Sequence, residues 1–238
     1  MKDFLFNNYS LLTHSVEAMA AITGLILFSR YKNTAVKYFI YFLVYLTVCD
    51  TVNEYTLLIY PDGILEFLAN TKISRNYWWS TLFWKIGAIL FFAFFYRKIL
   101  ERQLFKSIIK YAVYPFLVIS FTYILFHWED FFNRYFPVIS VLGTIIIFTC
   151  TIFYFIEVLQ TDKILTFYKS IYFYISAAIF TWWLIITPIV FYDIYMTNID
   201  MNYISLRRLI YLLANIIMYS TFTFALIFCK PKNKVVNA

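Results

Sequence analysis

Long apolar runs separated by short polar segments recur along the whole chain. Each run is continuously apolar and does not alternate with polar residues, which favours a membrane-spanning helix of about 20 residues over a barrel strand. The runs expected to cross the bilayer are Ser10–Phe28, Ala35–Ile59, Tyr77–Phe95, Ser107–Phe126, Pro137–Val158, Leu165–Tyr192 and Leu206–Cys229. The pattern predicts an all-α polytopic membrane protein, with seven transmembrane helices in a single domain over residues 1–238.

Basic residues predict how these helices are oriented. Most lysine and arginine residues flank the first, third and fifth expected connections or lie in the C-terminal tail, as Arg30, Lys98 and Lys163 do. Connections on the cytoplasmic side of a membrane carry an excess of lysine and arginine. We therefore expect a multi-pass protein of the cell inner (cytoplasmic) membrane, with its N-terminus outside and its C-terminus in the cytoplasm.

The composition agrees with a membrane protein and limits the functional classes. Hydrophobic residues make up 63% of the 238 residues and charged residues only 14%, whereas a soluble domain has about 25% charged residues. The net charge of +7 lies mainly at the predicted cytoplasmic rim, so nucleic-acid binding is a poor explanation for it. Cys49, Cys150 and Cys229 lie within or at the ends of spans and predict neither a disulfide nor a metal site.

Sequence motifs give no support for an enzyme. The only histidines are His14 and His127, which excludes a multi-histidine zinc site, and the chain has no GxSxG, HExxH or P-loop motif. No lysine lies between Leu209 and Phe228, where a retinal protein of this topology would carry its Schiff base. We therefore expect no enzymatic activity, cofactor or metal.

Ionisable and polar residues inside the first three expected spans form the strongest candidate site. Ionisable groups cost several kcal/mol in hydrocarbon unless they are paired or hydrated, so they mark functional sites. Helical spacing and short connections place this group at a similar depth in the outer leaflet. The group consists of His14, Glu17, Asp50, Asn53, Glu54 and Lys85. Asn215 and Tyr219 of the last span are expected to face the same space, with Arg207 and Arg208 at its mouth.

The charge balance of this group indicates a binding site. Three carboxylates face one ammonium and one imidazole, so the group cannot stay fully ionised without water or a bound cation. This favours an outward-facing pocket for a small polar ligand or a proton. The alternative is structural, with Lys85 pairing to Asp50 or Glu17 and fixing helix packing. Glu157 and Asp193, near the ends of their spans, are expected to be charges at the rim.

Three functional classes fit these features. The leading hypothesis is a receptor-like or accessory integral membrane protein that binds a small polar ligand or a proton. The second is a small transporter for a polar or cationic solute, since seven helices with an external N-terminus resemble the three-plus-one-plus-three architecture of sugar transporters. The third is a structural subunit of a membrane complex, in which the charges serve helix packing.

The last expected span resembles the endings of a group of bacterial proteins. Residues Asn215–Ser220 and Phe228–Lys230 are similar to the final helix of uncharacterised small seven-helix membrane proteins of bacteria. The resemblance covers this helix. It implies a sensory role beside a separate kinase, and hence a partner membrane or signalling protein that contacts the third connection or the helix surfaces.

Overall fold

The computed structural model describes residues 5, 8–195 and 201–231, and that part of the chain contains helices but no strand. The expected all-α fold class is therefore confirmed. The longer helices follow the apolar runs, because a backbone in hydrocarbon satisfies its polar groups within its own helix. They are α2 (Tyr9–Ile26), α4 (Val36–Asn53), α6 (Gly87–Ile99), α7 (Gln103–Phe126), α9 (Pro137–Leu159), α10 (Ile171–Tyr195) and α11 (Met201–Phe228).

Five helical segments of the described residues are long and apolar enough to cross a membrane. They are Tyr77–Ile99, Gln103–Phe126, Pro137–Leu159, Ile171–Asp193 and Met201–Phe228. The helices α2 and α4 occupy the places of the first two expected spans, with 18 residues each, and are not among these five. Polar residues such as His14 and Glu17 in α2 and Asp50 in α4 lower their apolar character. The residues that make the candidate site therefore also lower the apolar character of these two helices.

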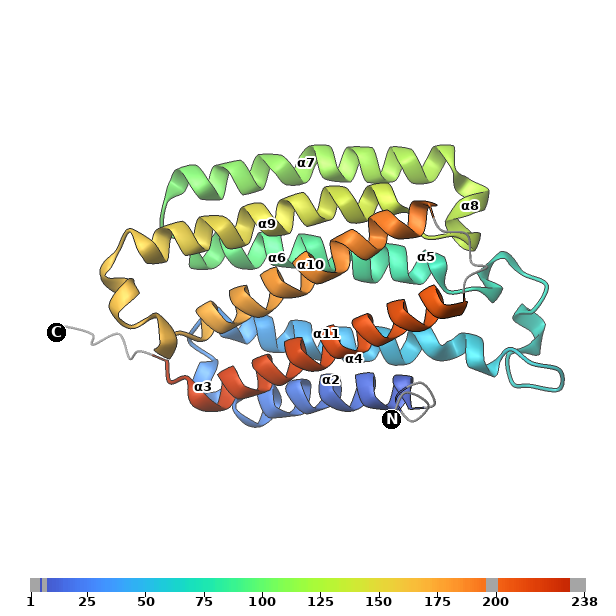
Figure 1. Cartoon of the computed structure of the whole chain (residues 1–238), viewed down its shortest axis with the longest axis horizontal. Coiled ribbons are helices and arrows are strands. Elements are labelled where there is room, and N and C mark those ends of the chain that lie inside the picture. The colour runs from blue at the N-terminus through green and yellow to red at the C-terminus, as the bar shows by residue number, and fades with distance from the viewer. Residues whose placement is uncertain (1–4, 6–7, 196–200, 232–238) are drawn as a thin grey trace.

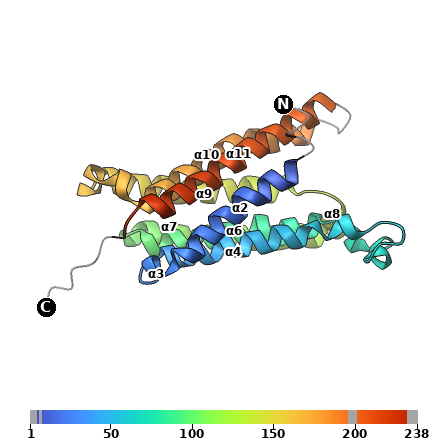
Figure 2. The ribbon, with the colours of Figure 1, turned by 90° about the horizontal axis from the view of Figure 1, so that it is seen from below.

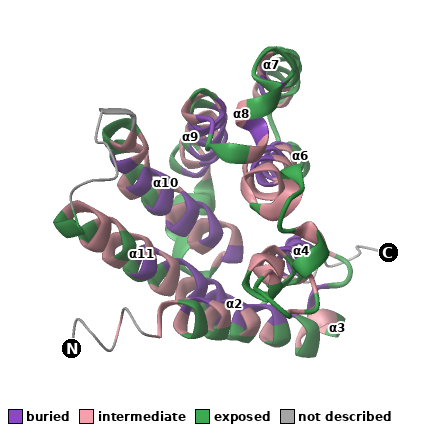
Figure 3. Ribbon diagram, turned by 90° about the vertical axis from the view of Figure 1, so that its right-hand side faces the viewer, coloured by how far each residue is buried: buried purple, intermediate pink, exposed green. Residues whose placement is uncertain are grey.

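The helices run along the long axis of the molecule and form a ring when viewed from one end (Figures 1, 2 and 3). Successive contacts join α2 to α11, α11 to α10, α10 to α9, α9 to α6 and α6 to α4, and α4 returns to α2. Helix α7 lies outside the ring, against α6 and α9 (Figure 3). Accordingly, only 22% of its apolar stretch is buried, compared with 50% of that of α9. The ring encloses the core and leaves the outer face of α7 open to lipid.

The two ends of the bundle differ in charge. Helix α2 begins at one end and α11 finishes at the other (Figure 1). The end where α11 finishes also holds α3 (Phe28–Tyr31) and the connection between α9 and α10, including the short helices η5 (Asp162–Leu165) and η6 (Phe167–Lys169). We call it the basic end, because it carries Lys32, Lys37, Lys98, Lys106 and Lys163 among other basic residues.

Close helix packing depends on small and aromatic side chains. At Gly143 in α9, an added Cβ would lie 1.8 Å from Cδ1 of Ile89 in α6, so a larger residue there would require the Ile89 side chain to move. Small residues commonly allow such close crossings between helices in membranes. Across the ring, the buried rings of Phe39 in α4 and Phe222 in α11 pack edge to face with centroids 4.9 Å apart.

The third apolar segment is not a uniform α-helix. It starts as α5 (Tyr77–Trp79), continues as the π-helical segment η4 (Ser80–Ile86) and becomes α6 at Gly87. A π-helical turn contains an extra residue and frequently marks a functional site. The hydroxyl of Tyr45 in α4 donates a hydrogen bond to the carbonyl oxygen of Phe83 at 2.9 Å, which supports the irregular turn. This segment sets the directions of Trp84 and Lys85.

Helix boundaries differ from those expected, most of all at the end of the second span and the start of the sixth. Helix α4 ends at Asn53, and the 3-10 helix η1 (Glu54–Leu58) follows it, whereas the second span was expected to reach Ile59. Helix α10 begins at Ile171, because η5 and η6 occupy the segment around the expected start at Leu165. Apolar residues continue across both boundaries, so hydropathy does not reveal where the backbone hydrogen-bond pattern changes.

Candidate functional site

Glu17 is the innermost residue of the candidate site. Its side chain in the middle of α2 is completely buried. The hydroxyl of Tyr219 in α11 donates a hydrogen bond to Glu17 Oε1 at 3.1 Å. Glu17 Oε2 lies 3.7 Å from His14 Nδ1, one helical turn away, and neither of these two atoms has a hydrogen-bond partner among the described residues. Tyr219 thus gives the buried carboxyl group a neutral hydrogen-bond donor.

Asp50 lies beside Glu17 and extends the site onto α4. Its carboxyl group is partly buried and interacts with Glu17 and with the indole of Trp84 in η4. Two carboxyl groups in contact cannot both remain ionised in a poorly solvated place without a cation or a shared proton. The expected proximity of Glu17 and Asp50 is therefore present in the structure.

Glu54 connects the buried acids to the end of the bundle. It accepts a hydrogen bond from His14 Nε2 at 2.8 Å and another from the Ser10 hydroxyl. The side chains of His14 and Glu54 are 28% and 38% exposed, while that of Glu17 is fully buried. His14, Glu17, Asp50 and Glu54, which we call the acid cluster, therefore form a continuous path from the core toward the end opposite the basic end.

Asn53 lies beside the acid cluster and organises the backbone around it. Its carbonyl oxygen accepts a hydrogen bond from the Asn76 side chain at 3.1 Å, and its side-chain oxygen accepts one from Ser80 at 3.4 Å. Both donors lie at the start of the third apolar segment. Through these two hydrogen bonds, Asn53 links the end of α4 to that segment.

Lys85 is not paired with the acid cluster. Its ammonium group lies over the ring of Tyr135, 4.9 Å from the centroid, and the nearby carboxylate that acts on it most is Asp193. No lysine or arginine of the described residues lies within 4.0 Å of a carboxylate oxygen of Glu17, Asp50 or Glu54. The structure thus gives no support to an ion pair of Lys85 with Asp50 or Glu17 that fixes helix packing.

The two arginines expected at the pocket mouth differ in their contacts. Arg207 pairs with Asp193 at 2.9 Å, and Tyr203 donates a hydrogen bond to the same carboxylate oxygen at 2.6 Å. Arg208 is exposed. Asp193, which was expected to be a solvated rim charge, is instead a partly buried ion-pair partner that ties α10 to α11.

Asn215 reaches the site through two tryptophans. Trp182 in α10 donates a hydrogen bond to the side-chain oxygen of Asn215 at 2.7 Å, and its ring stacks on that of Trp84 at 5.7 Å. Trp84 is the residue that interacts with Asp50. A cavity of about 10 Å³, sufficient for about one water molecule, is lined by both tryptophans. Asn215 therefore supports the wall of the acid cluster from behind.

Ser10 and Trp84 also contact the acid cluster, although the sequence did not predict them as part of the site. Ser10 begins the first apolar run, and its spacing of four residues from His14 is the signal that could have identified it. Trp84 directly precedes Lys85, but its direction depends on the π-helical turn, which hydropathy does not show. Among the described residues, no group of three or more His, Cys, Asp or Glu side chains could hold a metal ion.

Comparisons with known proteins give no match. No protein family, curated protein or solved structure is significantly similar to the chain.

Proposed function

We propose that the protein is a receptor-like or accessory subunit of the cell inner membrane, which binds a proton or a small cationic or polar ligand at the acid cluster. The observation that carries this proposal is the surroundings of Glu17. Its fully buried carboxyl group has Tyr219, His14 and Asp50 as neighbours, and no lysine or arginine of the described residues forms an ion pair with it. An unpaired buried carboxylate is costly, so a proton or a bound cation would stabilise the site.

The path of the acid cluster supports a ligand that enters from the end of the bundle where α2 begins. Exposure rises from Glu17 through His14 to Glu54. The basic residues gather at the opposite end, which the positive-inside rule assigns to the cytoplasm. A ligand at Glu54 would therefore come from outside the cell, as expected for a sensory or accessory subunit.

A transporter for a polar or cationic solute is the second candidate, and one feature of the ring favours it. Helices α2, α4 and α6 form one half of the ring, α9, α10 and α11 form the other, and α7 packs outside against α6 and α9 (Figure 3). The halves meet where α6 contacts α9 and where α2 contacts α11. Transporters commonly place binding sites between two halves that rock against each other.

The proposal is tested by a ligand screen on the purified full chain. A bound cation or small polar metabolite is expected to raise the melting temperature by several degrees, because ligand binding stabilises the folded state. Glu17→Gln and Asp50→Asn are expected to abolish this rise. Lys85→Met is the matched control, because Lys85 lies over Tyr135 outside the acid cluster, and it should retain the rise.

A proton as the ligand is tested by infrared spectroscopy at neutral pH. A protonated carboxyl group gives a C=O band that an ionised one lacks, and Glu17→Gln or Asp50→Asn should remove it. If no compound shifts the melting temperature and no such band is present, the binding proposal is wrong. If a compound that binds is also taken up by proteoliposomes containing only this chain, the transporter replaces the receptor-like role.

A further inference from the structure

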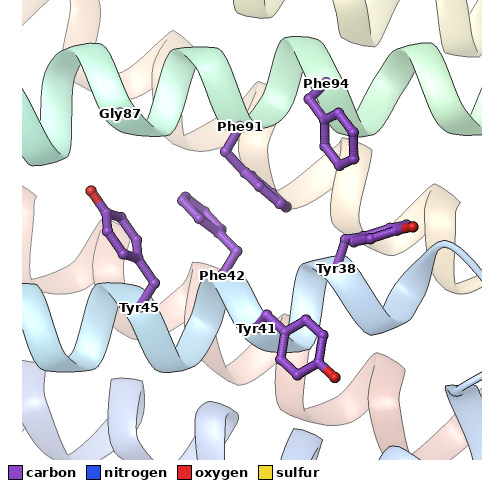
Figure 4. Close-up of a pocket in the computed structure, with 7 residues that line it drawn as sticks. All are labelled: Tyr38, Tyr41, Phe42, Tyr45, Gly87, Phe91 and Phe94. Atoms are coloured by element: carbon purple, nitrogen blue, oxygen red, sulfur yellow. The ribbon is translucent and has the colours of Figure 1, made fainter.

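An aromatic groove lies on the outer surface of the ring between α4 and α6. It has a volume of about 330 Å³ and is lined by Tyr38, Tyr41, Phe42, Tyr45, Gly87, Phe91 and Phe94 (Figure 4). None of these residues belongs to the acid cluster. The floor is closed by Phe42 and Phe91, whose rings stack with centroids 3.8 Å apart. The groove is therefore a second surface feature that the proposed function leaves unexplained.

The inner end of the groove exists because residue 87 is glycine. An added Cβ there would lie 2.9 Å from the hydroxyl oxygen of Tyr45, which is held by its hydrogen bond to Phe83. From Gly87 to Phe94 the helix rises by about 10 Å at 1.5 Å per residue. The groove thus runs along the helices over two turns toward the basic end (Figure 4).

Two lysines stand at the end of the groove nearest the basic end. The ammonium group of Lys37 lies 5.1 Å from the centroid of the Tyr38 ring, and that of Lys98 lies 5.6 Å from the centroid of the Phe94 ring. These two rings pack edge to face at 5.2 Å and line this end of the groove. Neither lysine is ion-paired with a carboxylate of the described residues. The two lysine ammonium groups, neither of them ion-paired, therefore flank the end of the apolar groove that is expected to lie at the membrane surface.

We infer that this groove binds an anionic phospholipid of the leaflet at the basic end. One acyl chain lies along Phe42 and Phe91, and the phosphate group lies between Lys37 and Lys98. The charges are complementary, and lysines at this depth can place their ammonium groups at the headgroup level. A partner helix is a poorer occupant, because helix interfaces in membranes use small residues, whereas bulky aromatic side chains form the walls here.

The inference is tested by native mass spectrometry of the full chain with equal amounts of phosphatidylglycerol and phosphatidylcholine of identical acyl chains. The original chain is expected to retain phosphatidylglycerol with a preference of at least about fivefold, the factor that one basic residue near an anionic lipid supplies. Lys37→Gln combined with Lys98→Gln should abolish the preference. The matched control, Lys106→Gln with Lys110→Gln on α7, removes the same charge from the same end and should keep it.

Two further measurements separate the groove from general charge attraction. Gly87→Leu, which fills the inner end of the groove, should reduce retention of both lipids, with a melting temperature showing that the variant remains folded. The phosphoglycerol headgroup without acyl chains should not bind. The inference is overturned if the original chain shows no preference, if both lysine pairs reduce it equally, or if a second copy of the chain occupies the groove in place of lipid.

Discussion

Glu17 shows how one residue determines what the candidate site can do. Transferring an ionised carboxylate from water to a protein interior costs several kcal/mol even after the surroundings relax. The Tyr219 hydroxyl is a single neutral donor at 3.1 Å, and such a hydrogen bond contributes a net of about 1 kcal/mol. This contribution is too small to offset the cost, which is why we propose that a proton or a cation is bound at Glu17.

Removing the Tyr219 hydroxyl should reveal how strongly it is coupled to Glu17. Tyr219→Phe leaves a buried carboxyl oxygen without its donor, and we expect a loss of about 1–3 kcal/mol in the free energy of unfolding. In a double-mutant cycle with Glu17→Gln, the two losses should not add, because the residues are in contact. Tyr41→Phe, at a side chain that is 54% exposed, is the control and should have no measurable effect. Additive losses would show that Tyr219 acts independently of Glu17.

The sequence predicted which of some candidate residues lie close together and missed the surroundings of others. Glu17, Asp50 and Tyr219 were predicted to lie close together from their depths along α2, α4 and α11, and they do. This prediction is possible because a regular helix rises by a constant distance per residue. The direction of Lys85 could not be predicted in this way, since it lies in a π-helical turn that interrupts the regular helical geometry. The pairing of Arg207 with Asp193 depends on the crossing of two helices, which a single sequence does not specify.

At the scale of elements, Glu157 connects α9 to the start of α7. It was expected to be a solvated charge near Lys163, but its side chain is only 3% exposed. Its carboxylate accepts hydrogen bonds from the backbone N–H groups of Glu101, at 2.9 and 3.1 Å, and Arg102, at 2.8 Å. Lys163 pairs instead with Glu101 at 2.7 Å. Hydropathy could not distinguish the two roles, because both place a charge near a helix end.

Glu157→Gln should therefore destabilise the protein, while Glu101→Gln should not. The first change removes a charged acceptor from buried backbone donors beside the N-terminus of α7, and we expect a loss of about 1–3 kcal/mol in the free energy of unfolding. The second breaks an ion pair whose side chains are 44% and 67% exposed, and such a pair contributes about 0–1 kcal/mol. Thermal unfolding in detergent measures both. Equal effects would contradict the linking role of Glu157.

At the scale of the whole molecule, the depth of the acid cluster depends on whether α2 and α4 cross the membrane. The first of the five strongly apolar segments begins at Tyr77, after α2 and α4. Hydropathy therefore gives the weakest support for a membrane crossing by these two helices. Both nevertheless lie in the ring, where α2 contacts α11 and α4 contacts α6. Burial within the protein shields their polar faces from lipid, so we expect both helices to span the bilayer despite these residues.

Cysteine labelling in intact cells tests this topology. Asn33→Cys lies at the basic end and Asn70→Cys at the opposite end, and both asparagines are exposed. The natural cysteines are all buried, so their background labelling should be low. A membrane-impermeant thiol reagent should label Asn70→Cys in intact cells, and Asn33→Cys only after the membrane is opened, because the basic end is expected to face the cytoplasm.

The pattern of labelling decides between distinct arrangements, since α4 is the long helix between the two positions. Labelling of only Asn33→Cys in intact cells would reverse the orientation and place Glu54 on the cytoplasmic side, so that the ligand would be an intracellular one. Labelling of both variants, or of neither, would mean that α4 does not cross the membrane. Asp50 and Glu17 would then lie at a different depth, and the cost of burial on which the binding proposal depends would no longer apply.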